Sequence, residues 1–127
     1  MAIPSGTGTE VLKRTTIHAQ SNTATAFRWD GTMATTGTST YTVTANHIIT
    51  VINVIFNEQA NASEEINLYM NDGSNNIQIL QSQALPAYGA FVWNDRLVLT
   101  AGDKLIFNAG SSANIDAICN YIDQDFT

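Results

Sequence analysis

Short runs of alternating apolar and polar residues follow one another along the chain, bounded by glycine, asparagine or aspartate. In the clearest case Ile66, Leu68 and Met70 alternate with polar side chains, and Asp72-Gly73 follows as a turn. A period of two is typical of a strand with one buried face. The runs recur at intervals of roughly ten residues, as in sandwiches and barrels. The pattern predicts an all-β fold, an antiparallel and jelly-roll-like β-sandwich of about eight or nine strands.

Apolar side chains fall on both faces of the run 46–57. They are Ile48, Ile52, Val54 and Phe56 at even positions, and Ile49, Val51 and Ile55 at odd positions. This distribution is typical of a strand that is covered on both sides, and no amphipathic helix is predicted that could cover the second side. We expect Trp29, Ile52, Val54 and Phe56 to lie in the core. The odd positions Ile49, Val51 and Ile55 are expected to contact another subunit.

The chain is expected to comprise an arm and one domain. Residues 1–9 form the arm, because Ile3-Pro4 disfavours a helix and the residues that follow are mostly small and uncharged. Residues 10–127 form a single β-sandwich domain, in which residues 41–44 are expected to add a short strand. The N-terminus has no basic segment followed by an apolar stretch, so no signal peptide is expected.

Composition and charge narrow the classes of partner. Hydrophobic residues make up 44% of the 127 residues, enough for a core, whereas only 13% are charged. The formal net charge is −6, and the five cations form no long run. The cations are Lys13, Arg14, Arg28, Arg96 and Lys104. A nucleic acid and an anionic membrane are therefore not expected as partners.

No self-contained catalytic or metal site is predicted. His18 and His47 lack a second ligand at metal-binding spacing, and Cys119 lies in an apolar run that predicts a small buried side chain. The oxygen-rich stretch 71–76 favours a hairpin turn over a calcium loop. No Gly-x-Ser-x-Gly motif is present, although a serine triad needs only to assemble in space. We expect no cofactor, no metal and no enzymatic activity.

The aromatic side chains permit a second interpretation. Most of them are expected to fill the core, as aromatic residues do in β-sandwiches. Tyr69 and Tyr88 are the ones expected to be exposed, where their rings could stack on a sugar. A module that binds host glycans is therefore kept as an alternative function.

Three stretches resemble small virion structural proteins of tailed bacteriophages. Residues 1–14 resemble the start of these proteins, and residues 41–47 resemble the entry into a core strand, with Thr44 in the place of the usual proline. Residues 97–105 and 109–118 resemble the C-terminal part of these proteins. That part has a leucine and a glycine-aspartate pair, followed by a turn rich in small residues and a final strand. The resemblance covers most of the chain, although each motif is short.

This resemblance implies a capsid decoration (cement) protein that assembles as a homotrimer and stabilises the head shell. Its partners would be other copies of itself and the major capsid protein or other virion subunits. Its location would be the virion, after assembly in the host cytoplasm. The residues expected to tie the arm to neighbours are Ile3, Pro4, Val11, Leu12 and Arg14. The alternative is a component of the tail or fibre that recognises host glycans.

Overall fold

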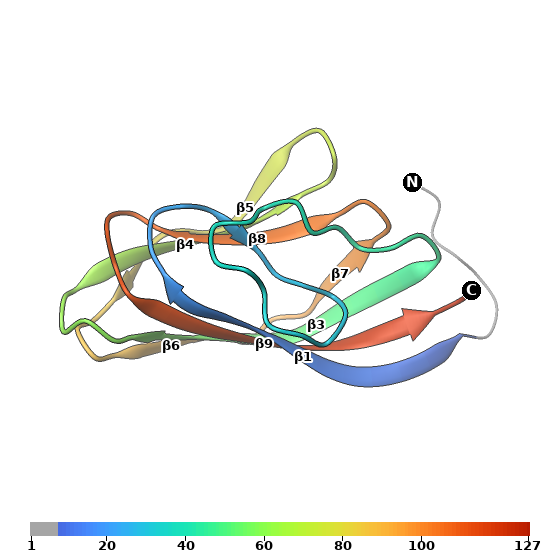
Figure 1. Ribbon diagram of the computed structural model, residues 1–127, viewed down its shortest axis with the longest axis horizontal. Coiled ribbons are helices and arrows are strands. Elements are labelled where there is room, and N and C mark those ends of the chain that lie inside the picture. The colour runs from blue at the N-terminus through green and yellow to red at the C-terminus, as the bar shows by residue number, and fades with distance from the viewer. Residues whose placement is uncertain (1–7) are drawn as a thin grey trace.

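The computed structural model describes residues 8–127 and folds them into nine strands in two antiparallel sheets (Figure 1). The strands are β1 (Thr9–Gln20), β2 (Thr25–Ala26), β3 (His47–Glu58), β4 (Glu64–Asn71), β5 (Asn76–Leu85), β6 (Ala90–Trp93), β7 (Leu97–Thr100), β8 (Lys104–Ala109) and β9 (Ile115–Asp125). One sheet has the order β1-β9-β3-β6, with β7 also paired to β3, and the other has the order β2-β8-β4-β5. The predicted all-β sandwich is confirmed.

The arm predicted at residues 1–9 lies almost entirely outside the described residues, and Ile3 and Pro4 with it. Its last residue, Thr9, is already the first residue of β1 and pairs with Asp125 of β9. β1 therefore begins one residue before the boundary expected from the sequence.

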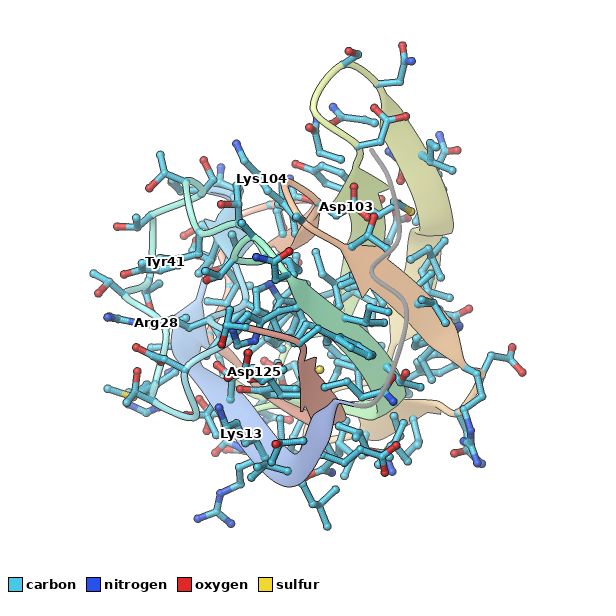
Figure 2. The ribbon with its side chains drawn as sticks, turned by 90° about the vertical axis from the view of Figure 1, so that its right-hand side faces the viewer. Lys13, Arg28, Tyr41, Asp103, Lys104 and Asp125 are labelled. Carbon is cyan, nitrogen blue, oxygen red and sulfur yellow. The ribbon has the colours of Figure 1, made fainter. Side chains whose placement is uncertain are left out.

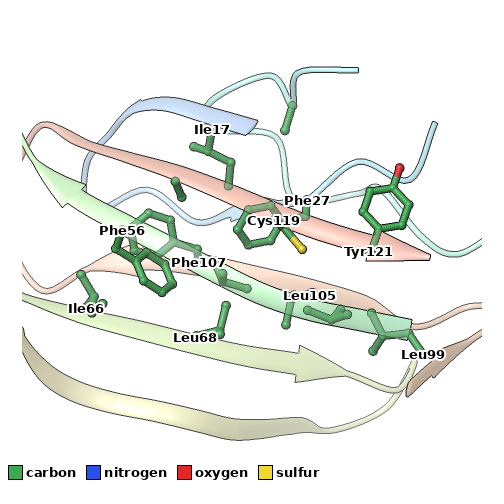
Figure 3. Close-up of a cluster of buried hydrophobic side chains, with 14 of the residues drawn as sticks. Ile17, Phe27, Phe56, Ile66, Leu68, Leu99, Leu105, Phe107, Cys119 and Tyr121 are labelled. Carbon is green, nitrogen blue, oxygen red and sulfur yellow. The ribbon is translucent and has the colours of Figure 1, made fainter. Parts of the chain in front are cut away.

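The core fills the space between the two sheets with large apolar side chains (Figure 3). Phe56 of β3 and Phe107 of β8 join the sheets, with their ring centroids 4.8 Å apart. Trp29 packs edge-on against Tyr121, at a centroid distance of 5.0 Å. Tilted and edge-on ring pairs contribute about 0.5–1.5 kcal/mol of stability beyond the contribution of the area that they bury. The aromatic side chains therefore hold the two layers together as the sequence predicts.

The connection between β2 and β3 lies along one side of the sandwich without forming a strand. The short strand expected at 41–44 does not form. Instead, the Val43 N–H donates to the Asp103 carbonyl and the Gly102 N–H donates to the Val43 carbonyl, both at 2.9 Å. Val43 is buried. The alternation of apolar and polar residues at 41–44 therefore reflects the buried Val43 side chain and its two backbone hydrogen bonds, and not a strand.

A β-bulge in β3 corrects the assignment of faces along this strand. Val51 pairs with Tyr121 and Asn53 with Asn120, so Ile52 is the extra residue. A bulge inserts one residue and so shifts the alternation of inward side chains. Before the bulge the inward residues are Ile49 and Val51, and after it they are Val54 and Phe56, all of which are buried.

The expected subunit contacts Ile49 and Val51 therefore lie in the core of this chain and are removed from the candidate interface. Ile52, expected in the core, is only partly buried, and so is Ile55. Trp29, Val54 and Phe56 lie in the core as predicted.

Candidate assembly interface

The outer face of the five-stranded sheet carries a first, mainly apolar row that crosses β1, β9, β3 and β7. The register places Leu12 beside Ile122, Ile122 beside Thr50, and Thr50 beside Val98. These side chains share the outward face because the inward positions between them belong to the core. Leu12 is 71% exposed and Val98 is 54% exposed. The ends of this row are therefore open to solvent.

A second apolar row lies parallel to the first. Thr16 pairs with Ile118, Ile118 with Ile55, and Ile55 with Val92 of β6. Val92 is 50% exposed and Ile118 is 38% exposed. β-Branched side chains on a pleated surface present a flat and rigid apolar area.

A polar row separates the two apolar rows. Arg14 on β1 pairs with Asn120 on β9, and Asn120 lies opposite Asn53 on β3. The Asn120 side-chain amide donates to the Asn53 side-chain oxygen at 2.8 Å, which fixes both amides on this face. Past Asn53 the row ends at the 94–96 link, which joins β6 to β7 and carries Asp95.

Polar pairs also border the face at both ends of the strands. At one end the His18 ring nitrogen Nδ1 and an Asp116 carboxylate oxygen are 2.8 Å apart. At the other end the Gln124 amide donates to the Glu10 carboxylate at 2.9 Å. The two apolar rows therefore lie between polar pairs at both strand ends, with the polar row between them.

Within residues 8–127 the side chains of Leu12, Val92 and Val98 on this face are left exposed. The segment 32–34 lies along the free edge of β1, where the Ala34 N–H donates to the Thr16 carbonyl at 2.9 Å. Here Met33, 60% exposed, lines a hollow of about 260 Å³ together with Arg14 and Ile118. Met33 therefore extends the second apolar row at the β1 edge.

The outer face of the four-stranded sheet differs in chemistry. Its outward side chains on β4 and β8 are mainly polar. They are Glu65, Asn67, Tyr69, Asn71, Lys104 and Asn108, with Ile106 nearly buried among them. Lys104 lies on the other side of the molecule from Lys13 (Figure 2). One outer face is therefore polar like an ordinary solvated surface, and the other is largely apolar.

The histidines take part in carboxylate pairs. His18 bonds Asp116, and His47 bonds Asp123 at 2.7 Å through Nδ1. Among residues 8–127 neither ring bonds a serine hydroxyl, and no three metal-binding side chains lie together. The Cys119 thiol is buried, and its burial raises the thiol pKa, which disfavours a reactive thiolate.

Asp123 is the centre of a buried polar cluster at one end of the sandwich. Its side chain is 4% exposed and accepts from Lys13 Nζ at 2.9 Å as well as contacting His47. His47 Nε2 also lies 3.5 Å from Asp125. Hydrogen bonds from Thr127, aided by the charges of His47 and Lys13, lower the pKa of Asp125. These contacts tie β1, β3 and β9 together and have a structural role.

A hollow beside the start of β4 is lined by carboxylates and by serine side chains. It has a volume of about 480 Å³ and is lined by Glu64, Glu65 and Ser111, among others. The Ser111 hydroxyl donates to Glu64 at 2.7 Å. Among the described residues that line the hollow there is no imidazole, so the Ser–His pair that commonly activates a serine nucleophile is not found there.

The residues predicted for subunit contacts divide into three groups. Ile3 and Pro4 lie outside the described residues. Leu12, Arg14 and Ile55 lie on the outer face of the five-stranded sheet, and Val11, 45% exposed, lies on β1 beside Asp123. Ile49 and Val51 are in the core.

Sequence reasoning missed Met33, Val92, Val98 and Ile118 as parts of this face. The last three were signalled by their positions, because each lies between two inward residues of a short alternating run. Met33 lies in a loop whose place beside β1 no pattern indicates.

The tyrosines expected to be exposed are not in one site. Tyr88 is 67% exposed in the turn between β5 and β6. Tyr69 is half-buried on β4, and this burial raises the pKa of its hydroxyl. The structure thus leaves Tyr88 alone as an exposed ring of the expected pair.

Residues 8–127 include no helix of the length and apolarity needed to cross a membrane.

Comparison with known proteins shows a shared fold. No protein-family model and no curated protein sequence matches the chain. A chain from the acidic stable capsid of the Helicobacter pylori bacteriophage KHP30 superposes with a TM-score of 0.51 and 8% identity, covering 91% of this chain and 86% of that one. A chain from the disulfide-linked pili of Bacillus endospore appendages gives a TM-score of 0.52 and 9% identity, covering 100% and 97%. The chain therefore shares the β-sandwich fold of these two chains.

Proposed function

We propose that the chain is a virion structural protein, and more specifically a capsid decoration protein that stabilises the head shell as a homotrimer. The observation that carries the proposal is the pair of exposed apolar rows on the outer face of the five-stranded sheet. Contiguous apolar area of this kind marks a contact surface rather than a solvated one. The resemblance of three sequence stretches to phage virion proteins supplies the more specific role.

The two structural neighbours support assembly in different ways. One belongs to a phage capsid and the other to a pilus whose subunits are disulfide-linked. Cys119 is the single cysteine of this chain and is fully buried, so it cannot link two copies of the folded domain. Non-covalent assembly through apolar surface is therefore the mode that this chain favours.

The partners follow from the same proposal. Other copies of the chain would cover the apolar face, and the segment that precedes β1 would reach a neighbouring subunit or the major capsid protein. An arm of this kind can add a strand to the edge of another sheet. We propose no role for nucleic acid, cofactor or metal.

Cryo-electron microscopy of the phage particle tests the proposal directly. The expected result is density for this sandwich on the outside of the head shell, grouped in threes. Density on the tail or fibre, or no density on the particle, would contradict the decoration role. The mass of the purified protein tests the trimer separately, because three chains are expected and a single chain would contradict it.

The glycan-binding alternative has one supporting observation, the exposed ring of Tyr88. A glycan array read with the purified protein tests it. Sugar binding that disappears in Tyr88→Ala would favour host recognition over the decoration role, whereas absence of binding would leave the decoration role as proposed.

A further inference from the structure

We infer that copies of this chain associate around a symmetry axis parallel to the strands of the five-stranded sheet, through the two opposite edges of its outer face. In this arrangement the β1 edge of one copy lies against the β6–β7 edge of the next, and Arg14 of one copy faces Asp95 of its neighbour. The inference rests on the proposed self-assembly and specifies which surfaces meet.

The rows of the face set the direction of the axis. A rotation about an axis parallel to the strands keeps every row at the same height in each copy. The first apolar row then meets its own continuation, Leu12 against Val98 of the next copy. The second row does the same, with Met33 against Val92. An axis perpendicular to the strands, lying in the plane of the sheet, would instead place the Arg14 side chains of two copies opposite each other.

Charge at the ends of the polar row agrees with this axis. Arg14 stands at the β1 end, and Asp95 lies in the link at the β6–β7 end, level with Asn53. Both are exposed, and within residues 8–127 neither forms an ion pair. The other basic side chain on β1, Lys13, is already held by Asp123. A head-to-tail contact would therefore pair a cation with an anion where the two edges meet, between the two apolar rows.

The size of the face sets the area that the ring can cover. Four strands at about 4.8 Å spacing, over the roughly 27 Å from Glu10 to His18, give an area of about 500 Å² per copy. Each copy shares this area between two neighbours, so one contact covers about 500 Å² in total, in the range of weak contacts that several charge pairs and apolar rows must share. A head-to-tail contact of this kind closes into a ring when the rotation closes, and the three-fold ring of the proposed trimer is one such case.

Charge reversal tests the pairing of Arg14 with Asp95. Arg14→Asp alone and Asp95→Arg alone are each expected to weaken association about tenfold, measured by analytical ultracentrifugation. The double variant should return to within about threefold of the wild type, because the pair is restored with reversed polarity. If the double variant instead loses as much free energy of association as the two single variants together, the pairing of Arg14 with Asp95 is overturned.

Two controls separate this effect from net charge. Lys104→Asp makes the same change of charge on the opposite sheet and is expected to leave association unchanged. Arg96→Asp, one residue past Asp95, adds a second negative charge opposite Arg14 and is expected to strengthen association. A loss of association in either control as large as in Arg14→Asp would overturn the inference.

A cysteine pair tests the contact of the two edges. Leu12→Cys with Val98→Cys places the two thiols three strand spacings apart in one copy, about 14 Å, too far for an internal disulfide. Under mild oxidation we expect disulfides between copies, closing into a covalent ring that peptide mapping assigns to 12 and 98. Buried Cys119 should remain reduced.

The outcomes distinguish this inference from the proposed function. An oligomer by mass with no 12–98 disulfide would overturn the surfaces named here while self-assembly stands. A monomer at all concentrations would overturn the inference and the proposed trimer together. The location of the chain on the particle is decided by microscopy alone.

Discussion

The two outer faces of the sandwich are formed by antiparallel strands, yet their chemistry differs. On β4 and β8 the outward positions hold Glu65, Asn67 and Asn108, whereas on β9 and its neighbours they hold Ile118, Ile122 and Val92. The four-stranded sheet follows the usual pattern of an antiparallel sheet, in which one face packs on the core and the other carries polar side chains toward solvent. The five-stranded sheet departs from the rule along two continuous rows. The difference teaches that the fold needs only one apolar face per sheet, so the second apolar face has another use.

The contrast between the two outer faces depends on the position of the bulge in β3, which decides which residues point inward. Two adjacent residues after the bulge test its position, and they give the largest expected change in the free energy of unfolding. Val54 is fully buried, so Val54→Asp should remove about 4 kcal/mol or more of stability and unfold the domain. Ile55→Asp, one residue on, faces outward and should change the free energy of unfolding by less than about 1 kcal/mol. Urea unfolding followed by circular dichroism measures both. Equal losses from the two variants would show that the register is wrong.

One charge added to each outer face tests which of the two faces takes part in self-association. Ile118→Asp lies on central strand β9 of the apolar face and should weaken self-association at least about tenfold, because a charge must lose its water on contact. Asn108→Asp on β8 adds the same charge to the polar face and should have no effect. Sedimentation equilibrium at several concentrations gives both constants. Equal weakening would mean that net charge, and not this face, controls association.

A smaller effect is expected from Glu58, which holds the segment that leads into β6. Its carboxylate accepts backbone N–H groups from Tyr88 at 2.8 Å, Ala60 at 2.7 Å and Ala62 at 3.3 Å. Burial alone would raise the pKa of Glu58, but these hydrogen bonds outweigh burial and lower the pKa from its ordinary value. Glu58 thereby steadies the turn that leads to Val92.

The sign of the pH dependence follows from the direction of this shift. A depressed folded-state pKa contributes stability above the unfolded-state pKa, and this contribution is lost as the pH falls through the folded value. Glu58→Gln should therefore lower the midpoint of thermal unfolding at pH 7, and the gap to wild type should narrow on acidification below about 4.5. Thermal unfolding between pH 3 and 7 measures the gap. A gap that widens toward low pH would contradict this role.

The smallest expected effect is that of salt. Copies with a formal charge of −6 repel one another, and salt screens that repulsion while leaving apolar contact intact. Association of the wild type should strengthen about twofold between low and moderate ionic strength. Light scattering in sodium chloride measures this change. A strong weakening by salt would indicate that charge pairs, rather than the apolar rows, dominate the contact.

Much of the fold could be predicted because each sheet has one buried face. The alternation at Ile66, Leu68 and Met70 identifies β4, and the glycine after Asp72 takes a positive φ of 98° in the hairpin turn. Residues 41–44 show the limit, because one anchored side chain such as Val43 produces the same alternation as a strand.

The candidate site could be predicted only in part, for a physical reason. A bulge shifts the alternation by one residue, but that shift is hidden where both faces of a strand carry apolar side chains, so Ile49 and Val51 could not be separated from Ile55. The sequence indicated that β3 has two apolar faces but not which residues belong to each. The rows themselves depend on register between strands far apart in the chain, as in the pairing of Thr16 with Ile118.

The pairing of Thr9 with Asp125 makes the domain mechanically directional. β1 and β9 are neighbours and antiparallel, so these two residues lie at the same end of the sandwich. A force that pulls residues 9 and 125 apart would open the ladder like a zipper, one hydrogen-bonded pair at a time. A force that slides β3 along β9 would have to break a ladder of pairs from His47 to Glu58 at once. The domain should therefore resist force best when the force acts along its strands, as it would on a shell that is stretched in that direction.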